Sequence, residues 1–167
     1  MSDSVNAFPA SSSAHTSGVL AIIVGGFIAG ILDLLYAILV YSPAKPILIA
    51  QTIASGVLGM RSYSGGIRTA ALGLFLHFVI ATGAATVYYL ASRKLVFLVQ
   101  HAVLCGLVYG ALVYLFMHWI VLPLSAAPHG HTPFIYRASE FVEHWFCVGL
   151  PIALSVRHYS PSSASAS

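Results

Sequence analysis

Residues 18–41 form an unbroken apolar run in which Asp33 is the only charged side chain. A helix rises about 1.5 Å per residue, so about 20 residues are enough to cross the hydrocarbon core of a membrane. In lipid every backbone N–H and C=O must find a partner within the protein, and a single segment achieves this only as a helix. We therefore expect this run to be a membrane-spanning helix.

Three further apolar runs have similar lengths. They cover residues 69–91, 95–122 and 133–156. Pro133 suits the first position of the last helix, whereas Pro151 lies inside it and is expected to kink it. The sequence therefore predicts an all-α membrane protein, an up-down bundle of four transmembrane helices within residues 18–158.

The composition excludes other broad classes. Only 7% of the residues are charged and 59% are hydrophobic, whereas soluble domains average about 25% charged residues. Seven Lys and Arg residues, scattered along the chain, are too few for a nucleic-acid interface. Residues 1–16 contain no Lys or Arg, so the first run is predicted to be a retained span and not a cleaved signal. Residues 1–17 and 159–167 are rich in Ser and Ala, and are expected to be disordered.

Residues 46–59 form a shorter apolar segment with helical spacing of Ile49, Ile53 and Val57. The segment is too short to span a membrane. Two interpretations remain, a helix in the membrane interface and a re-entrant helix. The interfacial helix is favoured because it needs no protein walls around it.

The basic residues give a weak indication of orientation. In an up-down bundle, one side carries Arg93, Lys94 and Arg157. The opposite side carries Lys45, Arg61, Arg68 and Arg137. The Arg93–Lys94 pair lies in a very short loop, where the positive-inside rule applies best. This favours a multi-pass protein with both termini in the cytoplasm.

Six ionisable side chains lie inside the predicted spans. They are Asp33, His77, His118, Glu140, Glu143 and His144. Ionisable groups at membrane depth are costly, usually face the bundle interior and often mark a functional site. Counting residues from the ends of the helices places these groups within about 6 to 16 Å of the same interface. The sequence thus predicts a candidate polar site in one half of the membrane.

Small residues share helix faces with the first two of these groups. Gly26 and Gly30 lie on the stripe of Asp33, and Gly73 lies on that of His77. Gly106 and Gly110 repeat the four-residue spacing in the third span. Since glycine allows close helix packing, Asp33 and His77 are expected to face protein.

Each polar group also has a structural interpretation. His77 can lock two helices together by a hydrogen bond, and His118, beside Trp119, can belong to the aromatic belt at the interface. Glu140 and Glu143 can complement the positive end of a helix that begins near residue 139. The functional alternatives are a transition-metal site, a haem ligated by two imidazoles, and a proton relay.

No sequence motif indicates an enzyme. The order of Glu140, Glu143 and His144 matches neither common zinc-protease pattern. No nucleotide-binding loop, nucleophile elbow or redox cysteine pair is present in the sequence. Cys105 and Cys147 lie in apolar runs and are interpreted as small buried side chains. A catalytic role is therefore not favoured.

Five segments of the chain resemble a family of small, uncharacterised bacterial inner-membrane proteins. They are Gly-Ile-Leu-Asp-Leu-Leu-Tyr-Ala (30–37), Gln-Thr-Ile-Ala-Ser-Gly-Val-Leu-Gly (51–59), Gly-Leu-Phe-Leu-His-Phe (73–78), Val-Leu-Pro-Leu-Ser (121–125) and Gly-Leu-Pro-Ile-Ala-Leu (149–154). The resemblance implies a bacterial inner (cytoplasmic) membrane location and four helices, and implies no activity.

Three functions remain open at this stage. The first is a non-enzymatic structural or accessory component of the membrane, which joins a larger complex or forms a homo-oligomer through its glycine stripes. The second is a protein whose polar intramembrane site binds a metal or haem or relays protons. The third is a small transporter that becomes complete on oligomerisation. All three have membrane lipid as a partner.

Overall fold

The computed structural model describes residues 10–128, 130 and 133–160, and these are helical throughout except at turns, with no strand among them. The α-helices are α1 (Ala10–Tyr41), α2 (Ile47–Leu58), α3 (Gly66–Ser92), α4 (Phe97–Gln100), α5 (Ala102–Phe116), α6 (Leu122–Leu124), α7 (Phe134–Glu143) and α8 (Leu150–Tyr159). A 3₁₀ turn, η1, covers Gly59–Ser64, and two π-helical segments cover Met117–Val121 (η2) and His144–Gly149 (η3). The predicted all-helical class is confirmed for this part of the chain.

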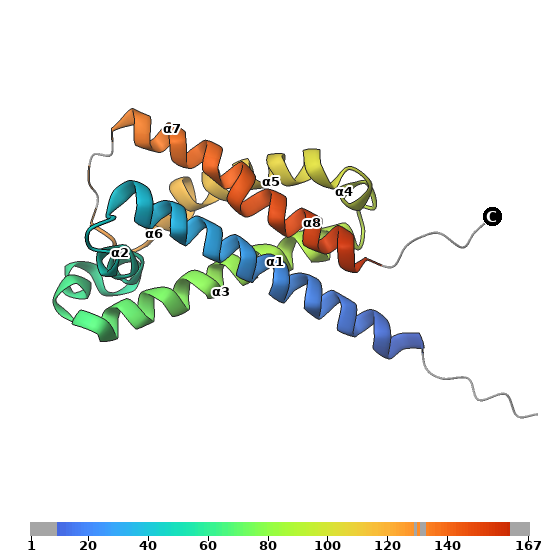
Figure 1. Ribbon diagram of the computed structural model, residues 1–167, viewed down its shortest axis with the longest axis horizontal. Helices are drawn as coiled ribbons and strands as arrows, with labels where there is room; N and C mark the ends of the chain where they lie inside the picture. Colours follow the sequence, from blue (N-terminus) through green and yellow to red (C-terminus); the bar gives the residue numbers. More distant parts are fainter. Residues whose placement is uncertain (1–9, 129, 131–132, 161–167) are drawn as a thin grey trace, which may run out of the picture.

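The helices pack as an elongated bundle. Figure 1 shows α1 and α3 running in opposite directions, α5 returning beside them, and α7 with α8 completing the bundle, so the end of α8 lies at the same end as the start of α1. Within the described residues, three helical stretches are long and apolar enough to cross a membrane, Ser17–Tyr41, Gly66–Ser92 and Ala102–Leu124. The stretch formed by α7, η3 and α8 is less apolar because its first half contains Arg137, Glu140, Glu143 and His144.

Glycines hold the helices at short separations. A Cβ atom on Gly26 would collide with the backbone of Thr82, and one on Gly30 with the ring of Phe78. Gly106 faces Gly149 across the α5–α8 contact. The buried core beside them consists mainly of small and aliphatic side chains: Ala21, Ala29, Ala85, Tyr88, Ala102, Val148, Ile152, Ala153 and Val156. Small residues in these positions allow the backbones to approach closely.

The surface of the bundle is apolar. Large hydrophobic side chains are exposed along every long helix, among them Leu39 (69% exposed), Phe75 (65%) and Leu104 (66%). Soluble proteins rarely expose contiguous apolar surface on this scale.

Helix α2 crosses the end of the bundle. Figure 1 shows it viewed nearly along its axis, whereas α1 and α3 are seen from the side. Its Ala50 carbonyl lies against Gly73, and Gln51 Nε2 donates to the Gly66 carbonyl at 3.1 Å. Gly59 and Gly66 have positive φ angles of 59° and 58° and form the turn into α3, a conformation that glycine adopts without strain.

The helix bounds differ from the predicted ones in three places. Helix α1 begins at Ala10 and not at residue 18, so residues 10–17 of the expected leader are helical. Residues 1–9 of that leader and residues 161–167 of the expected tail lie outside the described residues. The predicted third span is interrupted at His101, whose φ and ψ of −110° and 43° separate α4 from α5. The helical stretch at the position of the predicted fourth span ends at Tyr159, and the π-helical segment η3 occupies its centre.

Candidate functional site

The six predicted polar residues fall into two groups at the half of the bundle where α1 ends and α7 begins. The inner group consists of Asp33 on α1, His77 on α3, and Glu143 and His144 at the junction of α7 and η3. The outer group is the pair His118 on η2 and Glu140 on α7.

The centre of the inner group is formed by Asp33, Glu143 and His144. One ligand atom from each lies within 4.8 Å of the other two. Glu143 and His144 are buried, with 6% and 9% exposure, whereas the Asp33 side chain retains 27%. Two carboxylates and an imidazole therefore converge inside the bundle, with an approach from outside along Asp33.

His77 lies at the edge of this centre. Its Nε2 is 2.8 Å from the Gly30 carbonyl oxygen and 3.8 Å from Asp33 Oδ2. An Nε2–H group that donates to Gly30 joins α3 to α1 and fixes the ring beside Asp33. His77 thus acts on the centre through Asp33, and its ring also contacts Phe78 edge-on.

Glu143 is the least satisfied polar group of the site. Its side chain is 2% exposed, and its Oε1 has no hydrogen-bond partner among the described residues. Oε2 is 2.7 Å from His144 Nδ1. That nitrogen is also 2.9 Å from the Glu140 carbonyl oxygen, the usual i−4 position on a helix. A buried carboxylate without hydrogen bonds is strongly unfavourable unless a cation or proton compensates it.

The outer pair lies nearer the end of the bundle and is more accessible. His118 Nε2 is 3.4 Å from Glu140 Oε2, and their side chains are 25% and 27% exposed. Tyr114 connects the two groups, because its ring stacks on His118 at 3.9 Å and meets His144 edge-on at 5.4 Å. The Tyr114 hydroxyl donates to the Arg137 carbonyl at 3.2 Å.

The two segments that carry His118 and His144, η2 and η3, are π-helical. Leu122 N–H bonds Met117 O, and Leu150 N–H bonds Trp145 O, each five residues back. A proline lies two positions after the last residue of each segment, Pro123 after Val121 and Pro151 after Gly149. Proline lacks an N–H and leaves a carbonyl of the preceding turn without its donor, which favours a widened turn. Such π turns occur frequently at functional sites.

The sequence interpretation missed three side chains near the inner group. Cys147, one turn after Glu143, lies close to that carboxylate. The Tyr36 hydroxyl and the Trp145 indole nitrogen are buried without a hydrogen-bond partner among the described residues. Helical spacing was an available signal, because Cys147 follows Glu143 by four positions and Tyr36 follows Asp33 by three.

The five predicted packing glycines all face other helices of the same chain. Gly26 meets Thr82, Gly30 meets Phe78 and Gly73 meets Ala50. Gly106 and Gly110 meet Gly149 and His144. The contact of Gly110 with the His144 backbone places α5 directly behind the inner group. A homo-oligomer would therefore have to use another surface.

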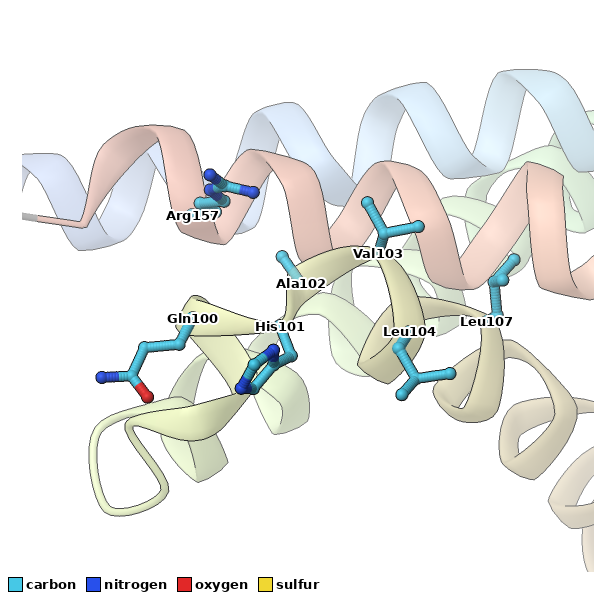
Figure 2. Close-up of a pocket in the computed structure, with 7 residues that line it drawn as sticks. All are labelled: Gln100, His101, Ala102, Val103, Leu104, Leu107 and Arg157. Atoms are coloured by element: carbon cyan, nitrogen blue, oxygen red, sulfur yellow. The ribbon is translucent and has the colours of Figure 1, made fainter.

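An open groove lies away from this site. A cavity of about 320 Å³ at the opposite end is lined by the α4–α5 junction and by Arg157 of α8 (Figure 2).

No protein-family model, curated protein or solved structure matches the chain.

Proposed function

We propose that the protein is an integral membrane four-helix bundle that binds a divalent transition-metal ion at Asp33, Glu143 and His144. In this proposal the fourth span is the stretch formed by α7, η3 and α8. Glu143 and His144 of this stretch turn into the bundle, whereas its exposed arginines, Arg137 and Arg157, lie towards its two ends. The exposed apolar side chains of α1, α3 and α5 contact lipid. The bacterial inner membrane, with both termini in the cytoplasm, is the location that the sequence supports.

One observation carries the metal-ion proposal, the buried Glu143 carboxylate, whose Oε1 has no hydrogen-bond partner among the described residues and whose Oε2 faces His144 Nδ1 at 2.7 Å. Asp33 and Glu143 together supply two negative charges, which a divalent cation neutralises in a medium where unpaired charge is costly. A proton would satisfy only one carboxylate oxygen. A divalent metal ion would neutralise both carboxylates and take the His144 imidazole as its third ligand.

The donor set and its dimensions suit such an ion. Ligands bound at about 2.0 to 2.2 Å lie at most about 4.4 Å apart, so groups within 4.8 Å of one another need to move only slightly. Imidazole with carboxylates is a ligand set typical of Zn²⁺, Mn²⁺ and Fe²⁺. Three protein ligands leave a coordination position open for water or another molecule.

Haem is less well supported. The His77 Nε2 is engaged by the Gly30 carbonyl, and His118 places Nδ1 3.2 Å from Tyr114 O and Nε2 3.4 Å from Glu140 Oε2. Ligation of a porphyrin iron through these nitrogens would require these contacts to break. The structural alternative has one supporting observation, the same His77–Gly30 contact, which locks α3 to α1.

Metal titration of the detergent-purified, chelator-treated protein tests the proposal. The wild type is expected to take up one Zn²⁺ or Mn²⁺ per chain and to unfold at a higher temperature when loaded, because the ion binds only the folded state. Glu143→Gln and Asp33→Asn keep the side-chain shape and remove a charged ligand. Each should weaken binding by more than about tenfold, the loss that even a supporting residue typically causes.

Glu140→Gln is the matched control, since it removes a carboxylate from the outer pair and leaves the three ligands intact. Its metal content should equal that of the wild type. A wild type that takes up no metal, or a Glu143→Gln variant that binds as tightly as the wild type, would overturn the proposal.

A further inference from the structure

The end of the bundle opposite the polar site carries a second feature, an open groove between α5 and α8. It is lined by Gln100, His101, Ala102, Val103, Leu104, Leu107 and Arg157. Figure 2 shows Arg157 on α8 beside Ala102 and Val103, with Leu104 and Leu107 following along α5. The groove therefore has polar side chains at one end and an aliphatic wall at the other.

The break at His101 creates this groove. The backbone turns there between α4 and α5, and this leaves Gln100 and His101 exposed at the start of α5. Gly106 packs α5 tightly on α8 one turn further along, against Gly149 and Ala153. Helices α5 and α8 are therefore in close contact at Gly106, and the groove between them is open toward the end of α8.

The charge at this end of the molecule is positive. Figure 1 shows α3 and α8 ending at the same end of the bundle. Arg93 and Lys94 directly follow α3, Arg157 lies in the last turn of α8, and all three are exposed. The acidic residues that the structure describes are Asp33, Glu140 and Glu143, and all three lie in the polar site. None of the ion pairs among the described residues involves Arg157.

We propose that this groove binds an anionic glycerophospholipid, with its phosphate at Arg157 and an acyl chain along Leu104 and Leu107. A guanidinium binds phosphate oxygens through two parallel hydrogen bonds, and basic residues near a membrane surface attract anionic headgroups. The cavity of about 320 Å³ is of the size of small-molecule sites, and its apolar wall suits hydrocarbon. The inference rests on the proposed insertion in a membrane, and it is independent of the metal site.

Native mass spectrometry of the detergent-purified full chain tests this proposal. Phosphatidylglycerol and phosphatidylethanolamine with the same acyl chains are added, and the retention of the two lipids is compared. The wild type should retain phosphatidylglycerol preferentially. Arg157→Gln should weaken this binding about tenfold, because it removes a charge-assisted pair of hydrogen bonds. Arg157→Lys should be intermediate, since it keeps the charge and loses the fork. Arg68→Gln, an exposed arginine at the other end, is the control and should bind as the wild type does.

Leu104→Ser tests the aliphatic wall at unchanged charge, and should weaken the binding of both lipids without unfolding the chain, because Leu104 is 66% exposed. Inorganic phosphate should not displace phosphatidylglycerol, because it cannot use this wall. Equal retention of the two lipids, equal effects of Arg157→Gln and Arg68→Gln, or displacement by phosphate would overturn the lipid site. The metal titration and the membrane fraction of the same samples show separately whether the proposed function holds.

Discussion

At the scale of single residues, the polar groups of the site differ in what they do. The buried Glu143 Oε1 has no hydrogen-bond partner among the described residues, whereas His77 Nε2 lies between the Gly30 carbonyl and Asp33. Sequence reasoning expected these residues at similar heights in the bundle, because height follows from counting along a helix, and the structure brings four of them together in the inner group. Sequence reasoning did not separate ligands from supporting residues, because hydrogen-bond partners depend on side-chain directions that a sequence does not specify.

This distinction predicts the behaviour of His77 variants. His77→Ala removes the hydrogen bond to Gly30 and leaves a cavity, so the free energy of unfolding should fall by about 1 to 3 kcal/mol. His77→Gln keeps an N–H donor and should recover part of the loss. Unfolding of the metal-free protein in mixed micelles by a denaturing detergent measures both, with the exposed His158→Ala as the control.

The metal affinity of His77→Ala should fall by about tenfold, the lower end of the loss typical of a residue that orients a ligand, because His77 contacts the site only through Asp33. A loss of binding as large as that of Glu143→Gln would instead place His77 among the ligands.

At the scale of helices, apolar length and helical spacing predicted most of the elements. The short helix predicted at 46–59 appears as Ile47–Leu58, and the second span predicted at 69–91 appears as Gly66–Ser92. The π turns and the break at His101 were not predicted. Hydrophobic patterns report which residues are apolar, and they are insensitive to whether an N–H bonds a carbonyl four or five residues back. The prolines at positions 123 and 151 were the only local sign of the widened turns.

The contact between α5 and η3 supports a prediction at this scale. A Cβ atom on Gly110 would overlap the His144 carbonyl group, so Gly110→Ala should push η3 away from α5. Overpacking of this kind typically costs about 1 to 3 kcal/mol, and the displaced His144 should also weaken metal binding.

Gly83→Ala provides the matched control, because the space around Gly83 is open and the residue lies inside α3. It should be stabilising by about 0.5 to 1 kcal/mol, the usual gain for alanine in a helix. Equal thermal unfolding of Gly110→Ala and Gly83→Ala would show that α5 and η3 are not packed as described.

At the scale of the whole molecule, an apolar exterior surrounds a small polar interior. The sequence predicted both, because the scarcity of charged residues requires an apolar solvent and the few ionisable groups lie at similar depth. It could not predict that the polar groups divide into an inner and an outer set, since that depends on how far each helix is rotated about its axis. Both proposed sites, the metal site and the lipid groove, require that hydrocarbon surrounds this bundle.

Washing of membranes from expressing cells with alkaline carbonate tests this requirement most directly, because the treatment strips peripheral proteins and leaves membrane-spanning ones. The chain is expected in the membrane pellet at pH 11 and in the soluble fraction only after detergent is added, while a peripheral marker protein in the same sample is released. Release of the chain together with that marker would contradict the account.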